Sequence, residues 1–375
     1  MKRILVLLTG GTITMVRNHQ TGALQPADVD TFKAFVPELF ACNVQVDMQP
    51  FTPLIDSSDI SPDNWVKIAK TIADNYNRYD GFVVLHGTDT MAYSASALSF
   101  MLENLSKPVV FTGSQLPVGV LRSDAKENLL AAIEIAAARG ADDRPMVPEV
   151  TICFEGNLFR ANRTTKKNAE HFEAFDSYNY PSLAKIGVHI QYRTNLIRYP
   201  REYGVRTNSV PMGAGYKVRA NNSPMSAEYG NPANSMPLFT HLHTCTDLAV
   251  LKLFPGINEA VVQATLAIPG LKGVVLETYG SGNAPSSHWL YNALRQATDK
   301  GIIIVNKTQC ATGSVDMGQY EVAQNLLKAG VISGYDITTE AILTKMMVVL
   351  GELSDNPDKV RHLLSIPIAG EMTID

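Results

Sequence analysis

Short apolar runs alternate with stretches of helical periodicity through the first half of the chain. The predicted strands are the runs Ile4–Leu8, Gly81–Leu85, Pro108–Thr112 and Val150–Phe154. Each run is apolar on both faces and is closed by Gly or a small polar residue, which is typical of parallel strands covered by helices. Helices are predicted over Asp63–Asn75, which opens with Ser61-Pro62 as cap and first turn, and over Lys126–Arg139, which ends at Gly140.

The same alternation returns in the last third of the chain. Strands are predicted at Leu248–Leu253, Gly273–Glu277 and Gly301–Val305, and helices at Asn258–Thr265, Ser286–Thr298, Gln319–Lys328 and Thr339–Leu350. Alternating strands and helices indicate an α/β fold with a parallel sheet in each half. The intervening segment is rich in Asn, Arg and Tyr and has no sustained period. We therefore expect domains over residues 1–190 and 246–375, joined by a connection over residues 191–245.

Composition narrows the class of protein. The chain has 375 residues, long for one hydrophobic core, and its net charge of −4 favours neither nucleic acid nor an anionic membrane as partner. The run Ile4–Leu8 is too short for the core of a signal peptide, and no apolar run of about 20 residues could span a membrane. The cysteines lack any CxxC or metal-ligand spacing and are expected to be reduced thiols: Cys42, Cys153, Cys245 and Cys310. We expect a cytoplasmic protein.

Candidate chemistry follows the ends of two predicted strands. The first is followed by Thr9-Gly10-Gly11-Thr12, and the second by His86-Gly87-Thr88-Asp89-Thr90. In open α/β sheets ligands bind outside the carboxyl ends of the strands, so two threonine hydroxyls are expected at one edge. The first motif alone is equally typical of a structural turn. The second is more informative, because helix capping would explain only one of its polar side chains, and the others are costly to bury idle.

Both motifs resemble the signature stretches of a known family. The segments VLLTGGTI and GFVVLHGTDTM are similar to those of the bacterial-type asparaginases, in their cytoplasmic type I branch. The similarity covers nearly the whole chain and continues through PLIDSSD, KPVVFTGSQLP, LRSDAKENLL, NRTTK, YGSGNAP and VNKTQC. It implies a doubly wound N-terminal parallel-sheet domain, a smaller C-terminal α/β domain, and active sites completed across a subunit contact of a homodimer or homotetramer.

The resemblance also implies roles for individual residues. Thr12 would be the nucleophile and would form a β-acyl-threonine ester as ammonia leaves asparagine. Because a threonine hydroxyl is a poor nucleophile at neutral pH, a relay of Thr88, Lys166 and Asp89 would support it. Lys166 would polarise Thr88, although the residue type alone is more typical of a solvated surface lysine. No metal or organic cofactor is expected.

Substrate recognition is implied by further matching positions. Asp89 would receive the substrate's α-ammonium group, and backbone N–H groups near Thr88 and in the turn at Ser114 would stabilise the oxyanion. The remaining implied residues are Asp56, Ser57 and Ser58 for the α-carboxylate, and Asn283 for the active site of a partner subunit. Asn283 is equally typical of a turn asparagine bonded to its own backbone. The chain departs from the family in the stretch Gln20–Pro26, which lacks the tyrosine usual on the mobile segment there.

Two other functions remain open at this stage. One is the asparaginase-like subunit of a glutamyl-tRNA amidotransferase, which normally carries an extra domain ahead of its TGGT motif. In this chain the motif begins at Thr9. The other is a non-catalytic amino-acid-binding protein on the same fold, which would have no need of both threonines and the lysine of the RTTK motif.

The sequence also predicts simple kinetics. Some type I relatives bind asparagine at a second, inter-subunit site and show sigmoidal kinetics, and this chain has two elements of that site, Thr165 and Thr308–Cys310. However, Glu277 stands where those relatives have the arginine that pairs with the effector's carboxylate. We expect a hyperbolic curve of initial rate against asparagine concentration. A Hill coefficient clearly above one that is lost on mutating Thr165 would contradict this.

Overall fold

The computed structural model describes residues 1–17, 22–40, 43–200, 237–318 and 321–374. They form two compact units, an N-terminal unit described at residues 1–200 and 237–240 and a C-terminal unit described at residues 241–318 and 321–374. The predicted connection over residues 191–245 lies mostly outside the described residues. In the described ranges, no helix combines the length and the apolar character that crossing a bilayer would require.

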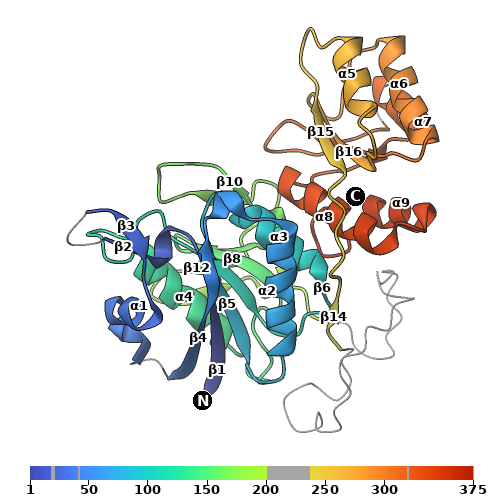
Figure 1. Ribbon diagram of the computed structural model, residues 1–375. Coiled ribbons are helices and arrows are strands. Elements are labelled where there is room, and N and C mark those ends of the chain that lie inside the picture. The colour runs from blue at the N-terminus through green and yellow to red at the C-terminus, as the bar shows by residue number, and fades with distance from the viewer. Residues whose placement is uncertain (18–21, 41–42, 201–236, 319–320, 375) are drawn as a thin grey trace. The chain divides into compact units, whose positions relative to one another are not determined.

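An eight-stranded sheet runs through the N-terminal unit in the order β13-β12-β9-β8-β7-β5-β1-β4 (Figure 1). The strands from β8 to β4 are parallel to one another, and β9, β12 and β13 complete the sheet in antiparallel pairs. In chain order the strands are β1 (Lys2–Gly10), β4 (Val44–Ile55), β5 (Gly81–Leu85), β7 (Val109–Thr112), β8 (Val150–Phe154), β9 (Asn157–Arg160), β12 (Ala184–Ile186) and β13 (Ile190–Tyr192).

Helices cover both faces of this sheet. Alternate residues of a strand point to opposite faces, and Ile4, Val6 and Leu8 of β1 share one buried cluster with α1 (Val29–Phe35) and α4 (Ala125–Ala137). The helices α2 (Pro62–Asp74) and α3 (Met91–Met101) pack on each other, and α3 also packs against β7 and β8 (Figure 1). This arrangement confirms the predicted α/β class with a doubly wound N-terminal sheet.

The differences from the predicted elements have local causes. The long strand β4 was not predicted because it lies at the sheet edge, is mostly half-buried or exposed, and carries Pro50 and Pro53. The antiparallel strands β9, β12 and β13 are too short to show a period. The helix α4 ends at Ala137, short of the predicted Gly140, because Ala138 already has an extended backbone with ψ of 138°.

The C-terminal unit is built on a smaller parallel sheet, in the order β15-β16-β17-β18. Its strands are β15 (Leu248–Lys252), β16 (Gly273–Thr278), β17 (Ile303–Thr308) and β18 (Ile332–Ser333), and its helices are α5 (Glu259–Leu266), α6 (His288–Asp299), α7 (Glu321–Lys328), α8 (Thr339–Leu353) and α9 (Pro357–Ser365). A smaller α/β unit was predicted here. The strand predicted at Gly301–Val305 lies further along the chain, because polar residues such as Asn306 are also buried in it.

Short elements complete the N-terminal unit. Three two-stranded pairs are β2 (Met15–Arg17) with β3 (Leu24–Pro26), β6 (Leu102–Glu103) with β14 (Phe239–Thr240), and β10 (Thr165–Lys166) with β11 (Phe175–Asp176). The 3₁₀ helices are η1 (Thr12–Thr14), η2 (Pro37–Phe40), η3 (Ser57–Asp59), η4 (Ala161–Arg163) and η5 (Thr194–Leu196). Of the stretch expected to lack the lid tyrosine, Gln20 and Thr21 lie outside the described residues.

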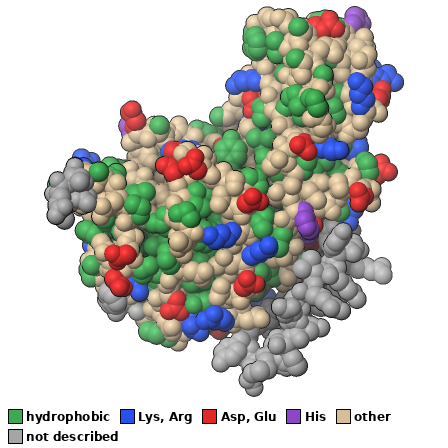
Figure 2. Space-filling view, in the orientation of Figure 1, with side chains coloured by type: hydrophobic (Ala, Val, Ile, Leu, Met, Phe, Trp, Pro, Cys, Tyr) green, Lys and Arg blue, Asp and Glu red, His purple; other side chains and the backbone are tan. Residues whose placement is uncertain are grey.

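Charge is evenly distributed on the face of the molecule shown in Figure 2. Basic and acidic side chains lie among one another there, without a broad field of either sign. This agrees with the small net charge of −4. Attraction of a charged ligand on this face would therefore depend on individual side chains.

Candidate active site

The loops that follow β1, β4 and β5 meet at the carboxyl edge of the N-terminal sheet. β1 pairs in parallel with both other strands, so the three carboxyl ends are neighbours. Gly11 has φ of 84°, and a Cβ there would come within 2.3 Å of the nitrogen of Gly87. A Cβ on Gly87 would lie 2.4 Å from the hydroxyl oxygen of Ser57. The two glycines thus allow the loops carrying Thr12, Thr88 and Ser57 to touch.

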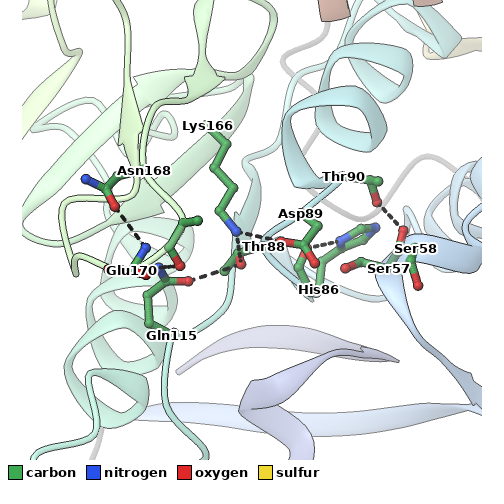
Figure 3. A network of polar contacts seen from close by, with 12 residues as sticks. Ser57, Ser58, His86, Thr88, Asp89, Thr90, Gln115, Lys166, Asn168 and Glu170 are labelled. Carbon is green, nitrogen blue, oxygen red and sulfur yellow. Dashed lines mark hydrogen bonds and ion pairs between the residues drawn. The ribbon is translucent and has the colours of Figure 1, made fainter.

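Lys166 reaches this edge from β10. Its ammonium group donates to the hydroxyl of Thr88 at 2.8 Å and forms an ion pair with Asp89 at 2.6 Å (Figure 3). The side chain of Lys166 is 16% exposed, whereas that of Asp89 is 69% exposed. The structure therefore brings together the three residues predicted as a relay. Lys166 is not a freely solvated surface lysine.

Gln115 orients the hydroxyl of Thr88 from the other side. The hydroxyl donates to Gln115 Oε1 at 3.2 Å, while Gln115 Nε2 donates to the carbonyls of Ala169 and His171 at 3.2 and 3.0 Å (Figure 3). Those carbonyls can only accept, so they hold the amide with its oxygen toward Thr88. Gln115 was not among the site residues predicted from the sequence. Its position directly after Ser114, beyond the end of β7, was the available signal.

Thr12 lies in η1, in the turn that follows Gly11. Both the backbone nitrogen and the hydroxyl of Thr14 donate to the carbonyl of Gly11, at 3.1 and 2.9 Å, and these bonds hold the turn. The side chain of Thr12 is half-buried. Within the described residues, its hydroxyl has no hydrogen-bond partner, so it remains available to a ligand.

The residues predicted to grip a carboxylate form a turn after β4. Asp56 Oδ1 accepts from both the backbone nitrogen and the hydroxyl of Ser58 at 2.9 Å, and the backbone bond lowers the pKa of the exposed Asp56. Ser57 is buried, and its carbonyl accepts from the hydroxyl of Thr90 at 2.6 Å. Asp56 and Ser58 thus stabilise the turn that holds Ser57 against the loop after β5.

Thr90 also answers the question of helix capping. The N-cap residue of α3 is Thr90, not Thr88 or Asp89, and its hydroxyl bonds to Ser57. Capping therefore does not explain the side chains of Thr88 and Asp89. Both are instead bonded to Lys166.

The turn after β7 contributes mainly through its backbone. Ser114 is buried, and its hydroxyl donates to the carbonyl of Leu116 at 2.5 Å. The hydroxyl of Thr112 donates to the carbonyl of Cys153 at 2.8 Å. With these protons bonded within the protein, a predicted oxyanion contact from this turn would come from a backbone N–H group.

His86 is buried beneath the loop after β5. Its Nδ1 lies 2.7 Å from the carbonyl oxygen of Gly87, and its ring lies 6.0 Å from that of Phe111. Burial lowers the pKa of His86 to about 4, so the imidazole is neutral at neutral pH. Since a carbonyl only accepts, the single ring hydrogen is on Nδ1. His86 belongs to one of the two predicted motifs, but no role was predicted for it from the sequence.

The remaining predicted site residue lies in the C-terminal unit. Asn283 closes a turn after β16, where its backbone exchanges hydrogen bonds with Tyr279 at 2.9 and 2.8 Å. Its reach into a partner subunit's site stays a prediction. Glu277, also buried in this unit, accepts from Thr339 at 2.9 Å and lies 3.8 Å from Lys252. Within its own unit, its carboxylate thus has both a hydrogen-bond donor and a basic neighbour.

The described side chains suggest no metal centre. Within the described ranges, no group of three or more His, Cys, Asp or Glu side chains is arranged to hold a metal ion. The described cysteines, Cys153, Cys245 and Cys310, are free thiols, and Cys42 lies outside the described residues. The groups that meet at the sheet edge include hydroxyls, the ammonium of Lys166, carboxylates and backbone N–H groups, which suit acyl transfer to a hydroxyl.

Known proteins that are similar to this chain match it in both units. Residues 3–198 match the family described as Asparaginase, N-terminal, and residues 247–364 match the Glutaminase/Asparaginase C-terminal domain. The chain is 41% identical to L-asparaginase 1 of Escherichia coli strain K12 over 375 residues, covering 100% of this chain and 99% of that protein.

Two further similarities extend the comparison. The crystal structure of L-asparaginase I from Vibrio cholerae has a TM-score of 0.82 and 36% identity, covering 100% of this chain and 99% of that one. The 60 kDa lysophospholipase of Mus musculus is 37% identical over 396 residues, covering 100% of this chain but 63% of that longer protein.

Fold and site together define a two-unit α/β protein whose candidate site is a hydroxyl-rich edge of a parallel sheet. The matches identify it more narrowly. The chain belongs to the asparaginase family of amidohydrolases, and to its type I branch.

The burial of His86 predicts how stability depends on pH. Its folded pKa of about 4 lies below the ordinary 6.5, so between these values the unfolded chain binds more protons. Stability should fall as the pH drops from 6.5 toward 4, by about 3 kcal/mol from this group. Urea unfolding of His86→Asn should show a shallower loss over this range than wild type, whereas the exposed His189→Asn control should not. Equal slopes for wild type and His86→Asn would contradict the prediction.

Proposed function

We propose that this chain is an L-asparaginase that hydrolyses the side-chain amide of L-asparagine to L-aspartate and ammonia. The observation that carries the proposal is the cluster that Lys166 forms with Thr88 and Asp89, whose loop is in contact with the Thr12 turn. The identity of 41% to L-asparaginase 1 along the full chain supports the same reaction.

In this proposal Thr12 is the nucleophile. Its oxygen attacks the amide carbon, its proton passes to the leaving amine, and ammonia departs to leave a β-aspartyl ester on Thr12. Water then hydrolyses the ester, which restores the hydroxyl and releases aspartate. Thr88, whose hydroxyl is held between Lys166 and Gln115, would pass the proton from Thr12 toward the leaving amine, with Lys166 beside it.

The substrate's charged ends are assigned to the two neighbouring loops. Asp89 keeps most of its side chain in solvent and can receive the α-ammonium group while bonded to Lys166. Ser57 is assigned to the α-carboxylate, with Asp56 and Ser58 fixing its turn. This division places cationic and anionic ends of one amino acid on different loops, and the side-chain amide between them.

We also propose the setting in which the enzyme works. It would be a cytoplasmic homodimer or homotetramer that needs no metal or organic cofactor, with Asn283 of one subunit reaching the site of another. The free thiols support a reducing compartment. Ammonia release by the purified chain alone would distinguish this function from a non-catalytic binding protein. It would also separate it from an amidotransferase subunit that works only with its partners.

Thr12→Val should abolish turnover without unfolding the protein, because the two side chains are nearly isosteric. We expect ammonia release from asparagine to fall by a factor on the order of 10⁴ or more. Thr12→Ser should keep measurable activity, since it retains a hydroxyl. Thr88→Val should also be slow, and intact-mass measurement should then reveal the accumulated aspartyl ester. A folded Thr12→Val enzyme with substantial activity would rule out Thr12 as nucleophile.

The two adjacent lysines provide a matched test of the relay. Lys166→Met should lower kcat on the order of 100-fold, as expected for loss of a group that takes part in proton transfer. Lys167→Met should leave kcat unchanged, because Lys167 is paired with Asp176 at 3.1 Å and with Glu173 at 3.6 Å instead. Equal kcat values for the two folded variants would exclude a specific role for Lys166.

A further inference from the structure

We propose that His86 is a positioning residue. By donating from Nδ1 to the carbonyl of Gly87, it fixes the Gly87–Thr88 peptide so that the N–H of Thr88 faces the substrate and stabilises the oxyanion. This inference rests on the proposed function, because it assigns a part of the same reaction. It concerns a buried side chain that the proton relay does not use.

The geometry of the Gly87–Thr88 peptide determines where its N–H group points. In a trans peptide the C=O and N–H bonds point to opposite edges of one plane. The carbonyl of Gly87 is 2.7 Å from His86 Nδ1, so the N–H of Thr88 points away from the buried ring. Within the described residues, this N–H has no acceptor, whereas the N–H of His86 itself donates to Thr112 at 2.9 Å.

The Gly87–Thr88 peptide lies next to the loop that carries Thr12. Gly11 and Gly87 approach so closely that a Cβ on Gly11 would be 2.3 Å from the nitrogen of Gly87. Thr12 follows Gly11 directly, so the proposed nucleophile and the N–H of Thr88 come from loops in direct contact. An oxyanion formed at the carbon that Thr12 attacks is therefore within reach of a donor in this loop.

The orientation of the Gly87–Thr88 peptide needs a restraint beyond its own backbone torsions. Glycine adopts far more backbone conformations than other residues, so the plane that follows Gly87 is weakly fixed by its own torsions. A flipped peptide would present a carbonyl oxygen where a donor is required, and an acceptor repels the developing negative charge. A hydrogen bond from His86 to the carbonyl selects the orientation that presents N–H.

The imidazole is well suited to hold this bond. It is 1% exposed and packs against Phe111. In the neutral ring Nδ1 carries the hydrogen, and Nε2 has no hydrogen-bond partner. The bond to Gly87 is thus the one polar contact of the His86 side chain among the described residues, which separates its role from general support of the core.

Two substitutions distinguish the positions of the ring nitrogens. In His86→Asn the amide nitrogen takes the place of Nδ1 and can still donate to Gly87, whereas in His86→Gln it takes the place of Nε2 and cannot. We expect His86→Gln to lower kcat for asparagine by ~10- to 100-fold with KM nearly unchanged, because a displaced oxyanion donor acts mainly in the transition state. His86→Asn should stay close to wild type. His86→Leu should match His86→Gln and replaces it if that variant is unstable.

A tetrahedral adduct provides a second measurement. Aspartate β-semialdehyde should add the Thr12 hydroxyl across its aldehyde, so that the Thr12 oxygen bonds to carbon and its proton goes to the former carbonyl oxygen. His86→Gln should bind this aldehyde ~10- to 100-fold more weakly than wild type, the same range as its loss of kcat, and bind L-aspartate equally well. A role in folding alone would weaken both ligands together or neither.

The outcomes separate the two proposals. Active wild-type enzyme whose folded His86→Gln and His86→Leu variants keep full kcat would overturn the role of His86 alone. So would an Asn variant as slow as the Gln variant at the same melting temperature, or equal weakening of aldehyde and aspartate. A wild-type protein that releases no ammonia from asparagine would overturn both proposals.

Discussion

Close backbone contact at one edge of the N-terminal sheet is the constraint on which the candidate site depends. β1 pairs with β4 on one side and β5 on the other, which brings three loops together. They can touch only because positions 11 and 87 lack a Cβ, since an added carbon would come within 2.3 to 2.4 Å of neighbouring atoms. Thr12, Ser57 and Thr88 owe their proximity to this contact rather than to interactions among their own side chains.

A second interaction, between Lys166 and the loop after β5, brings a charge into that frame. Lys166 comes from the short hairpin β10–β11, far along the chain from Thr88 and Asp89. Its ion pair with Asp89 balances the ammonium group, so the site gains a cationic side chain without an isolated buried charge. Gln115 then fixes the direction of the Thr88 proton. Three separate segments of the chain, carrying Thr88, Lys166 and Gln115, thus fix the position of the Thr88 hydroxyl.

The sequence predicted those features that leave a local or motif-level mark. The buried strands β5 and β8 were predicted with their exact bounds, because each is a short, mostly apolar run that is buried throughout. The edge strand β4 left no such mark, since it is half exposed and interrupted by proline. The threonine motifs pointed to the sheet edge where the candidate site lies, and resemblance then added Lys166, which the structure places beside Thr88. The domain bounds and the role of Asn283 stay predictions.

Gln115 and His86 show what sequence reading could not supply. Their hydrogen bonds depend on which atom of an amide or imidazole faces which carbonyl, and those carbonyls belong to residues fixed only by the fold. Gln115 is oriented by Ala169 and His171, more than fifty positions away. His86 is bonded to its own neighbour Gly87, but its burial comes from the sheet and from Phe111. No spacing rule within the chain encodes either orientation.

The contact between Gly11 and Gly87 also limits how this site can diversify. Any substitution at these positions adds atoms. At position 11 the added atoms strike the main chain of Gly87, and at position 87 they strike the side chain of Ser57. The part of the site formed by positions 11 and 87 therefore cannot be adjusted gradually by exchange of side chains. New substrate preferences would arise at surrounding positions instead. The turn around Ser57 and the amide of Gln115 present side chains there that can be replaced. Side chains around the site can therefore be exchanged, and substrate preference can change with them. The backbone contact that brings the candidate catalytic loops together stays the same.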